Sequence, residues 1–458
     1  MPTFYIEQFG CRATQADGAA IERQLRERGS TLSDSPDGAE VVVVNTCTVT
    51  AAADAQAREA IRKLHAQNPS TRIVVTGCYA QRAPEELAVL PGVSYVVGNS
   101  HKPQIPDLLA PLGPLAPFAG SFVSLASLSG AAPILSGDIF EERGVLVAPV
   151  FGGESNHTRP TLKIQDGCNN RCAFCVIPFV RGRSRSLAPR TVIAEMRRLT
   201  EAGFKEIVLS GINLGAWGRD LSPRHGFLDL LKQILDETSV ERLRLSSIEP
   251  LDVSRDLIAF FASTPRLAAH FHMPLQSGSD RILGAMHRWY RSEHYARRVE
   301  LVREHLPHAA IGADVITGFP GESEEDHADT LGFIEQHPFS YLHVFSYSSR
   351  PGTRAAALPD QLGGSTIKRR ARELRSLGKA KSAAFYRSQS GRELSVLTLR
   401  HSEPSQSPEW TPALSSNYLK LRLAGRFPPN RLVSALCPSD PGRLAEVPPQ
   451  LRETIALA

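Results

Sequence analysis

The sequence predicts an α/β protein with three folded parts: an N-terminal open parallel sheet, a partial barrel of six strand–helix units, and a small C-terminal β-barrel. Three observations carry this prediction. Apolar strand-like runs alternate with amphipathic helix patterns near the start, and the same alternation returns further along the chain. Short strands separated by turn residues follow near the end. We expect these parts at residues 1–110, 158–381 and 382–458, with a linker or insertion at 111–157.

Composition places the 458-residue chain among ordinary globular proteins, with 42% hydrophobic and 22% charged residues. Its 52 Lys and Arg against 47 Asp and Glu give a net charge of +5, which is compatible with a nucleic-acid partner but does not identify one. The sequence contains no run of about 18 apolar residues, so we expect no membrane span. The start MPTFYIEQFG lacks the pattern of a secretory signal. We therefore expect a cytoplasmic protein, in which seven cysteines indicate metal binding or catalysis rather than disulfides.

Three cysteines end the predicted strands of the N-terminal part. FYIEQFGC, VVVVNTC and RIVVTGC read as strands that end at Cys11, Cys47 and Cys78, and VSYVVGN reads as a fourth. The carboxyl ends of parallel strands meet at one edge of the sheet, where ligands bind. The three thiols are therefore expected to share a metal site. The alternative is that each is a small buried apolar residue, which is a common role of free cysteine.

The next three cysteines form a compact loop, GCNNRCAFC, with Cys168, Cys172 and Cys175 at the spacing C-x3-C-x2-C. Three thiolates hold three irons of a 4Fe–4S cluster and leave the fourth open to a chelating substrate. A zinc site with a distant fourth ligand or a redox pair is the alternative, although zinc sites more often show paired C-x2-C units. Cys437 lies in the apolar run RLVSALC and is assigned to the core, without a functional role.

Six strand–helix units follow, which indicates an open arc of strands rather than a closed eightfold barrel. Sites in such barrels lie at the carboxyl ends of the strands, and the cysteine loop follows the first strand. Other strand ends carry glycine or polar residues, and the Glu249 carboxylate could accept from a ribose hydroxyl or an amino group. Ordinary turn chemistry is the alternative for these residues. The expected strands are TLKIQ, KEIVLSG, RLRLSSIE, HFHMPLQSG, GADVITGF and YLHVFSYSS.

The remaining segments are less informative. Residues 111–157 are rich in Gly, Ala, Pro and Ser and read as a connection, with one packed strand in GVLVAPVF. Residues 365–381 contain seven Lys or Arg and one Glu, which indicates a last barrel helix with a basic face. Such a face is either solvated or in contact with nucleic acid. GRELSVLTL, NYLKLRLAG and NRLVSALC then read as the short strands of the C-terminal barrel.

The cysteine loop at a strand end resembles the signature of the radical S-adenosylmethionine superfamily. The longer string DGCNNRCAFCVIPFVRGRSRS, together with FGC, NTC and TGC upstream, is similar to the methylthiotransferase family. NTCTVT, IQDGCNNRC and HFHMPLQSGSDRIL most resemble the branch that modifies threonylcarbamoyladenosine in tRNA. The resemblance covers nearly the whole chain and is weakest over residues 111–157.

This resemblance implies two 4Fe–4S clusters. Cys168, Cys172 and Cys175 would hold the one that cleaves S-adenosylmethionine to a 5′-deoxyadenosyl radical. An auxiliary cluster on Cys11, Cys47 and Cys78 would hold or supply sulfur, with a second S-adenosylmethionine as methyl donor. The resemblance further implies that the S-adenosylmethionine pocket is lined by Gly211, Asn213, Glu249 and Gln276.

The implied reaction converts C2–H of N6-threonylcarbamoyladenosine at tRNA position 37 to C2-methylthio. The implied partners are the tRNA anticodon stem-loop, bound in part by a C-terminal TRAM domain, and a low-potential electron donor such as a flavodoxin or ferredoxin. Two related activities compete, one on N6-isopentenyladenosine in tRNA and one on an aspartate of a ribosomal protein. A non-catalytic iron–sulfur RNA-binding protein is the alternative from another class, and the intact cysteine loop and the glycine-bearing strand ends weigh against it.

Overall fold

A computed structural model describes residues 2–109, 131–142, 144–146, 158–401 and 409–448. The chain forms two compact units. The N-terminal unit contains residues 1–150, 165–185 and 348–356, and the barrel unit contains residues 151–164, 186–347 and 357–458. The loop with the C-x3-C-x2-C cysteines therefore groups with the N-terminal residues, although its sequence follows the first barrel strand.

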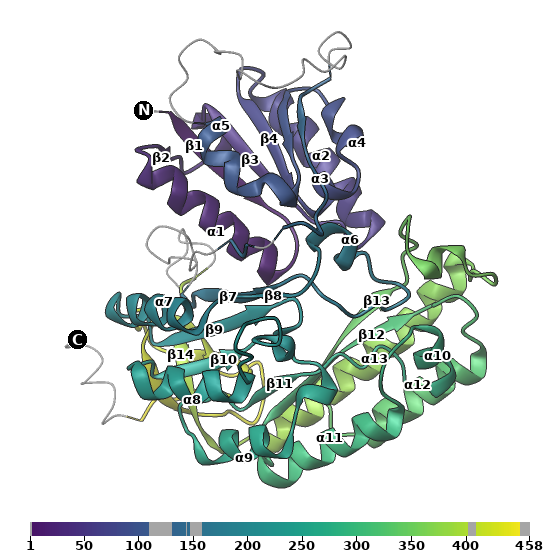
Figure 1. Cartoon of the computed structure of the whole chain (residues 1–458). Helices are drawn as coiled ribbons and strands as arrows, with labels where there is room; N and C mark the ends of the chain where they lie inside the picture. The colour runs from purple at the N-terminus through teal and green to yellow at the C-terminus, as the bar shows by residue number, and fades with distance from the viewer. Residues whose placement is uncertain (1, 110–130, 143, 147–157, 402–408, 449–458) are drawn as a thin grey trace. The chain divides into compact units, whose positions relative to one another are not determined.

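The N-terminal unit is built on a six-stranded sheet in which all pairings are parallel (Figure 1). The strands that were predicted at the three upstream cysteines and at VSYVVGN are all present. An unpredicted short strand pairs with the last of them and lies inside the predicted linker. The expected strand GVLVAPVF is not formed at residues 144–146, and its remainder lies outside the described residues. The order is β2-β1-β3-β4-β5-β6, with β1 Thr3–Gln8, β2 Thr31–Leu32, β3 Val41–Thr46, β4 Arg72–Gly77, β5 Val93–Val97 and β6 Ile134–Leu135.

Helices cover both faces of this sheet (Figure 1). On β3, Val43 packs with Ile21 of α1, whereas Val42 on the opposite face packs with Ile61 of α2. A strand covered on both faces needs apolar residues at every position, which explains the unbroken run VVVV. The helices of this unit are α1 Arg12–Glu27, α2 Ala51–Gln67, α3 Cys78–Arg82, α4 Pro84–Ala88, α5 Ile105–Leu108 and α6 Ile177–Arg181.

The six predicted barrel strands are present and, together with the unpredicted short strand β8, form two sheets, ordered β10-β9-β7-β8 and β11-β12-β13. Single bridges, Leu243 to Leu267 and Ser247 to His272, link β10 and the residues just after it to β11 and the residues just before it. The strands form an open arc, as the sequence predicted. They are β7 Thr161–Asp166, β8 Arg185–Ser186, β9 Glu206–Gly211, β10 Arg242–Leu245, β11 His270–His272, β12 Ala310–Thr317 and β13 Tyr341–Ser346.

Amphipathic helices alternate with these strands (Figure 1). The basic segment predicted as the last barrel helix is present, but it continues to Gln389 and so passes the expected boundary at residue 381. The helices are α7 Pro189–Glu201, α8 Phe227–Glu237, α9 Arg255–Ser263, α10 Asp280–Ala285, α11 Ser292–His305, α12 Glu324–Gln336 and α13 Gly364–Gln389. In the part of the chain that the structure describes, no helix is long and apolar enough to cross a membrane.

The C-terminal residues form an antiparallel sheet in the order β16-β15-β14-β17. Ala445 bridges to Leu423 and Glu446 bridges to Leu436, so the segment 445–446 joins the two edge strands of a small barrel. Cys437 is 1% exposed in its core, as predicted. Strand β15 was not predicted. The strands are β14 Glu393–Thr398, β15 Trp410–Ser415, β16 Lys420–Ala424 and β17 Leu432–Leu436.

This small barrel docks on the amino-terminal ends of the larger barrel's strands, within the same unit. The Arg244 guanidinium donates to the Glu206 carboxylate at 2.7 Å and to the backbone carbonyls of Ser415 and Ser416 at 3.0 Å. The Tyr418 ring stacks on His270 with centroids 4.2 Å apart. The C-terminal sheet is therefore part of the base of the barrel unit rather than a loosely tethered appendage.

Candidate metal centres

Cys11, Cys47 and Cys78 follow β1, β3 and β4, which are adjacent in the sheet. Cys11 is exposed, whereas Cys47 and Cys78 are buried. Burial, followed by the neighbouring thiols of Cys78 and Cys11, raises the pKa of Cys47 to about 12. The structure therefore brings the three predicted residues together. A thiol with such a pKa is deprotonated at neutral pH only when a metal ion binds it.

Gly10 allows this close approach. Its φ is +95°, and a Cβ at this position would lie 2.5 Å from the Cβ and 2.9 Å from the sulfur of Cys47. A larger residue would therefore occupy the space beside the Cys47 sulfur. The Asn99 amide donates to the Cys78 sulfur at 3.6 Å.

Cys168, Cys172 and Cys175 form the second centre, in a loop whose backbone is held at several points. The Cys168 N–H donates to the Gly182 carbonyl at 3.1 Å, and the Ala355 N–H donates to the Ala173 carbonyl at 2.8 Å. All three cysteines are partly exposed and line one cavity of about 590 Å³. The loop thus presents three sulfurs to a space large enough for a cluster and a small ligand. Phe140, Asn169, Arg171, Phe179, Arg183 and Arg354 are among the other lining residues.

The sulfur positions bear on the choice between a cluster and a zinc ion. The part of the chain that the structure describes contains one group of His, Cys, Asp and Glu side chains whose ligand atoms all lie within 4.8 Å of one another. This group contains no cysteine, so the three sulfurs of each trio do not all lie within that distance of one another. Ligands of a tetrahedral zinc ion, with bonds of about 2.3 Å, lie closer together than that. Three sulfurs that are more widely spread fit the corners of a four-iron cube better.

A buried charge network connects the two cysteine groups within the N-terminal unit. Arg181, in the helix that follows Cys175, donates to Asp166 at 2.9 Å and to Asp17 of α1 at 3.0 Å. Lys102 donates to the same Asp17 carboxylate at 2.8 Å. Burial opposes the charge of Arg181, but the surrounding Asp166 and Asp17 carboxylates and the Cys78 and Cys11 thiols raise its pKa. A permanent cation is therefore fixed beside the first cysteine group.

Two further contacts link the groups. Helix α3, which begins at Cys78, packs on α6 through a cluster of Cys78, Val176 and Val180. The Asp54 carboxylate, near the Cys47 loop, pairs with Arg82 and with Arg350. Arg350 belongs to the segment 348–356, whose Ala355 holds the other cysteine loop. Sequence reasoning did not identify these charged residues, because nothing in their local pattern distinguishes them from surface charges.

The residues proposed for the S-adenosylmethionine pocket lie in the barrel unit at or beyond strand ends. Gly211 ends β9, and Asn213 follows two residues later and is 9% exposed. Glu249 follows β10 and is ion-paired with Arg288. Gln276, with φ of +68°, donates its backbone N–H to the Asp314 carbonyl and accepts from the Ile316 N–H. Their role in binding remains a prediction.

Comparison with known proteins shows which families the N-terminal and barrel segments of the chain match. Residues 3–98 match the model described as "Uncharacterized protein family UPF0004", and residues 162–334 match the radical SAM superfamily. The Aquifex aeolicus "Threonylcarbamoyladenosine tRNA methylthiotransferase MtaB" is 36% identical over 94% of this chain and 99% of its own length. The Bacillus subtilis protein of the same name is 36% identical over 93% and 91%, respectively.

A second group of relatives is named for a different substrate. The "tRNA-2-methylthio-N(6)-dimethylallyladenosine synthase" of Syntrophobacter fumaroxidans is 33% identical over 95% of this chain and 90% of its own length. Among solved structures, the radical S-adenosylmethionine methyltransferase TsrM from Kitasatospora setae shares the fold, with a TM-score of 0.56, 16% identity, and coverage of 77% of this chain and 76% of its own. The chain therefore belongs to the radical S-adenosylmethionine methylthiotransferase family, in the branch of the threonylcarbamoyladenosine enzymes.

Proposed function

We propose that this enzyme converts C2–H of N6-threonylcarbamoyladenosine at tRNA position 37 to C2-methylthio, with two 4Fe–4S clusters and S-adenosylmethionine. Membership of the radical S-adenosylmethionine superfamily implies one such cluster and this cofactor. The observation that carries the proposal of a second cluster is the grouping of both cysteine trios in one compact unit. Each trio supplies one ligand fewer than a four-iron cluster can take, so each leaves an iron open to substrate.

The chemistry requires this arrangement, because adenine C2–H is too weakly acidic for acid–base catalysis. When bound, the cluster on Cys168, Cys172 and Cys175 would supply the electron that splits S-adenosylmethionine, and the cluster on Cys11, Cys47 and Cys78 would hold or supply the sulfur. The chain's own residues orient these groups and exclude water. Gly211, Asn213, Glu249 and Gln276 bind the cofactor at strand ends. Arg288 donates to one carboxylate oxygen of Glu249, and none of the described residues hydrogen-bonds to the other.

Two surfaces of the barrel unit support binding of RNA. The C-terminal sheet is a small barrel of the kind that binds nucleic acids. On α13, Lys368, Arg372, Arg375 and Lys379 are exposed and follow helical spacing, so they form a cationic stripe along one side of the helix. This stripe, together with the small barrel, holds tRNA phosphates without reading base sequence. Arg375 of the stripe also donates to the Val344 carbonyl at 3.4 Å. Among the other cations of α13, Arg370 pairs with Glu322 and Glu324, and Lys381 donates to backbone carbonyls.

The test is an anaerobic reaction of the reconstituted protein with a low-potential donor of the flavodoxin or ferredoxin class. The substrates are tRNA carrying threonylcarbamoyladenosine, tRNA carrying isopentenyladenosine, and a ribosomal protein with a modifiable aspartate. Mass spectrometry of digested products should show a methylthio group on the first alone. Reaction with either of the others would transfer the chain to a competing activity. Binding of tRNA without any S-adenosylmethionine cleavage would favour the non-catalytic alternative.

A further inference from the structure

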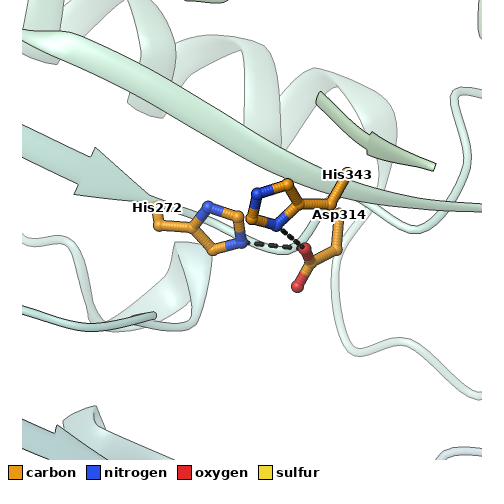
Figure 2. Close-up of side chains that lie close together, drawn as sticks. All are labelled: His272, Asp314 and His343. Carbon is orange, nitrogen blue, oxygen red and sulfur yellow. Dashed lines mark hydrogen bonds and ion pairs between the residues drawn. The ribbon is translucent and has the colours of Figure 1, made fainter. Parts of the chain in front are cut away.

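Three polar side chains meet on one face of the β11–β13 sheet (Figure 2). His272 Nε2 lies 2.9 Å and His343 Nδ1 lies 3.2 Å from the same oxygen, Asp314 Oδ1. The strand register places them together, because Asp314 pairs with His343 and His272 pairs with Gly312. Alternate residues of β12, Ile311, Ala313 and Val315, are buried on the opposite face. Three separate strands therefore deliver one cluster to the face that is not packed against apolar core.

The inner side of this cluster is fixed. His272 Nδ1 is hydrogen-bonded to the Tyr341 hydroxyl at 2.9 Å, and the same hydroxyl is 2.7 Å from His270 Nε2. The Tyr341 ring crosses β12 directly over Gly312, where any Cβ would overlap the ring. The orientation of His272, and through it that of Asp314, is therefore set by packing rather than by solvent.

The outer side is open and has unused hydrogen-bonding capacity. The side chain of His343 is 54% exposed and that of Asp314 is 24% exposed. Phe345, two residues further along β13, is also exposed. Burial alone would raise the pKa of Asp314, but hydrogen bonds from His272 and His343 lower it well below its usual range, so the carboxylate is ionised. Both imidazoles are hydrogen-bonded to the same oxygen, Asp314 Oδ1. Among the described residues none hydrogen-bonds to Asp314 Oδ2 or to His343 Nε2.

We propose that His272, Asp314 and His343 form the subsite that binds the N6-threonylcarbamoyl group of the target adenosine. This inference rests on the proposed function. Asp314 Oδ2 accepts from a urea N–H or the threonyl hydroxyl. His343 Nε2, whose ring already donates through Nδ1–H to Asp314, accepts from another of these donors. The substituent offers several N–H and O–H donors close together, as this pair of acceptor atoms requires.

The same cluster disfavours the competing substrate. An isopentenyl group has no donor or acceptor, so placing it here would remove water from an ionised carboxylate and an imidazole without replacing their hydrogen bonds. Sites that hydrogen-bond a substrate group discriminate strongly against analogues that lack it. His343 and Asp314 therefore act as specificity-determining residues for the N6 substituent.

A divalent cation is the competing occupant, since the three ligand atoms lie within 4.8 Å of one another. It would use Asp314 Oδ1, His272 Nε2 and His343 Nδ1, the atoms that already bond to each other. The two free atoms, Asp314 Oδ2 and His343 Nε2, would then remain unused at the open side. An organic ligand with several polar groups uses these atoms and leaves the internal hydrogen bonds intact, and for this reason we favour it.

The experiment compares binding of two synthetic anticodon stem-loops that differ only in carrying threonylcarbamoyladenosine or unmodified adenosine. The reconstituted wild type, Asp314→Asn, His343→Ala and, as a matched control, His327→Gln are titrated with both at one salt concentration. His327 forms another imidazole–carboxylate pair, with Glu373 at 2.7 Å, outside the cluster. We expect the wild type and the control to prefer the modified loop. The preference should fall roughly 10- to 100-fold in both cluster variants, the loss typical of a hydrogen bond to a charged group.

A general folding defect weakens binding of both loops and leaves their ratio unchanged, so an unchanged ratio overturns the inference. Metal analysis of the same proteins gives a second criterion. Zinc or iron beyond the two clusters that is present in the wild type and absent from Asp314→Asn would mark a cation site and also overturn it. Methylthiolation of the modified loop by the wild type is measured in parallel. If it fails, the proposed function falls; if it succeeds while the ratios stay equal, the subsite assignment alone falls.

Discussion

Arg181 and Asp17 form a buried ion pair, 3.0 Å between nitrogen and oxygen, with each side chain 2% exposed. Arg181 closes the helix that follows the C-x3-C-x2-C loop, and Asp17 lies in the helix that follows Cys11. One ion pair thus connects the supports of the two cysteine groups. Its partners lie 164 residues apart in the chain.

Replacing Arg181 with Gln should destabilise the N-terminal unit by about 3–5 kcal/mol, because Asp17 and Asp166 lose a buried partner. All three tryptophans, Trp217, Trp289 and Trp410, lie in the barrel unit. In anaerobic urea titrations the circular dichroism transition should therefore shift, while the tryptophan fluorescence transition stays near that of the wild type.

The matched control for this variant is Arg198→Gln. Arg198 pairs with Glu195 at 3.3 Å and is 47% exposed, so its loss should cost about 0–1 kcal/mol. If Arg181→Gln is as stable as this control, the pair does not support the cysteine centres.

The two trios should divide the chemistry. Reconstituted wild type should carry about eight irons, and Cys168, Cys172 and Cys175 changed together to Ala should halve this and abolish S-adenosylmethionine cleavage. The corresponding variant of Cys11, Cys47 and Cys78 should also lose half the iron. It should still form 5′-deoxyadenosine but should not methylthiolate tRNA. Iron analysis and chromatography of the products check both. A folded protein that binds only zinc would refute the assignment of clusters.

The stripe on α13 should contribute to tRNA affinity through phosphates. Changing Lys368, Arg372, Arg375 and Lys379 to Ala should weaken binding and make it less dependent on salt. The slope of log K against log salt should fall by roughly 0.7–0.9 for each phosphate that the variant no longer neutralises. Arg369→Ala on the same helix is the control, because Arg369 pairs with Glu324 and Glu373. Equal slopes for the stripe variant and the wild type would exclude the stripe from the RNA surface.

These substitutions are a better test of the RNA surface than removal of the tail. Truncation from residue 382 would cut α13 before its end at Gln389. It would also remove the Ser415 and Ser416 carbonyls from Arg244, whose other partner is the buried Glu206 carboxylate. A truncated protein would therefore lose stability of the barrel unit together with any binding of RNA by the tail, and the two effects would not be separable.

Most of the fold was predictable because strand ends and cysteines coincide in the sequence. Cys47 and Cys78 directly follow strands that contain unbroken apolar runs, so we expected the two cysteines to meet at one sheet edge from the rule for parallel strands. The grouping of the Cys168 loop with the N-terminal unit was not predictable. It depends on contacts made across long separations, such as Arg181 with Asp17 and Ala355 with Ala173, which leave no periodic signal in the sequence.

The His272, Asp314 and His343 cluster carried a signal that was missed. HFH, GADV and YLHV place a polar residue at alternate positions inside strands that are otherwise apolar, and a polar residue there needs a partner. Which polar residues face one another depends on strand register. Register is set by features such as the space that Gly312 leaves for Tyr341, and a single sequence does not show it.

Glu206 should make the barrel unit sensitive to acid. Burial alone would raise its pKa, but Arg244, Arg159 and Arg242 lower it to about 2. Because the folded pKa lies below the ordinary value, the stabilisation is complete above pH of about 4.5 and is lost as pH falls from there toward 2. The urea midpoint, followed by tryptophan fluorescence, should be lower in Glu206→Gln than in the wild type at pH 7. This difference should shrink below pH of about 4.5.

The control for acid sensitivity is Glu293→Gln. Glu293 pairs with Arg297, and both side chains are about two-thirds exposed, so we expect no comparable pH-dependent difference. A constant difference between the wild type and Glu206→Gln from pH 7 to 3 would show that Glu206 is not held ionised by its arginines.

Methylthiolation of threonylcarbamoyladenosine is tested most directly by nucleoside mass spectrometry of tRNA from a strain that lacks the gene. Loss of the enzyme should leave threonylcarbamoyladenosine without its methylthio group. The wild-type gene should restore the modified nucleoside, whereas the Cys172→Ala and Cys47→Ala variants should not. If the deletion strain still contains 2-methylthio-threonylcarbamoyladenosine at the wild-type level, and instead lacks 2-methylthio-isopentenyladenosine or the methylthio group of a ribosomal protein, the account is contradicted.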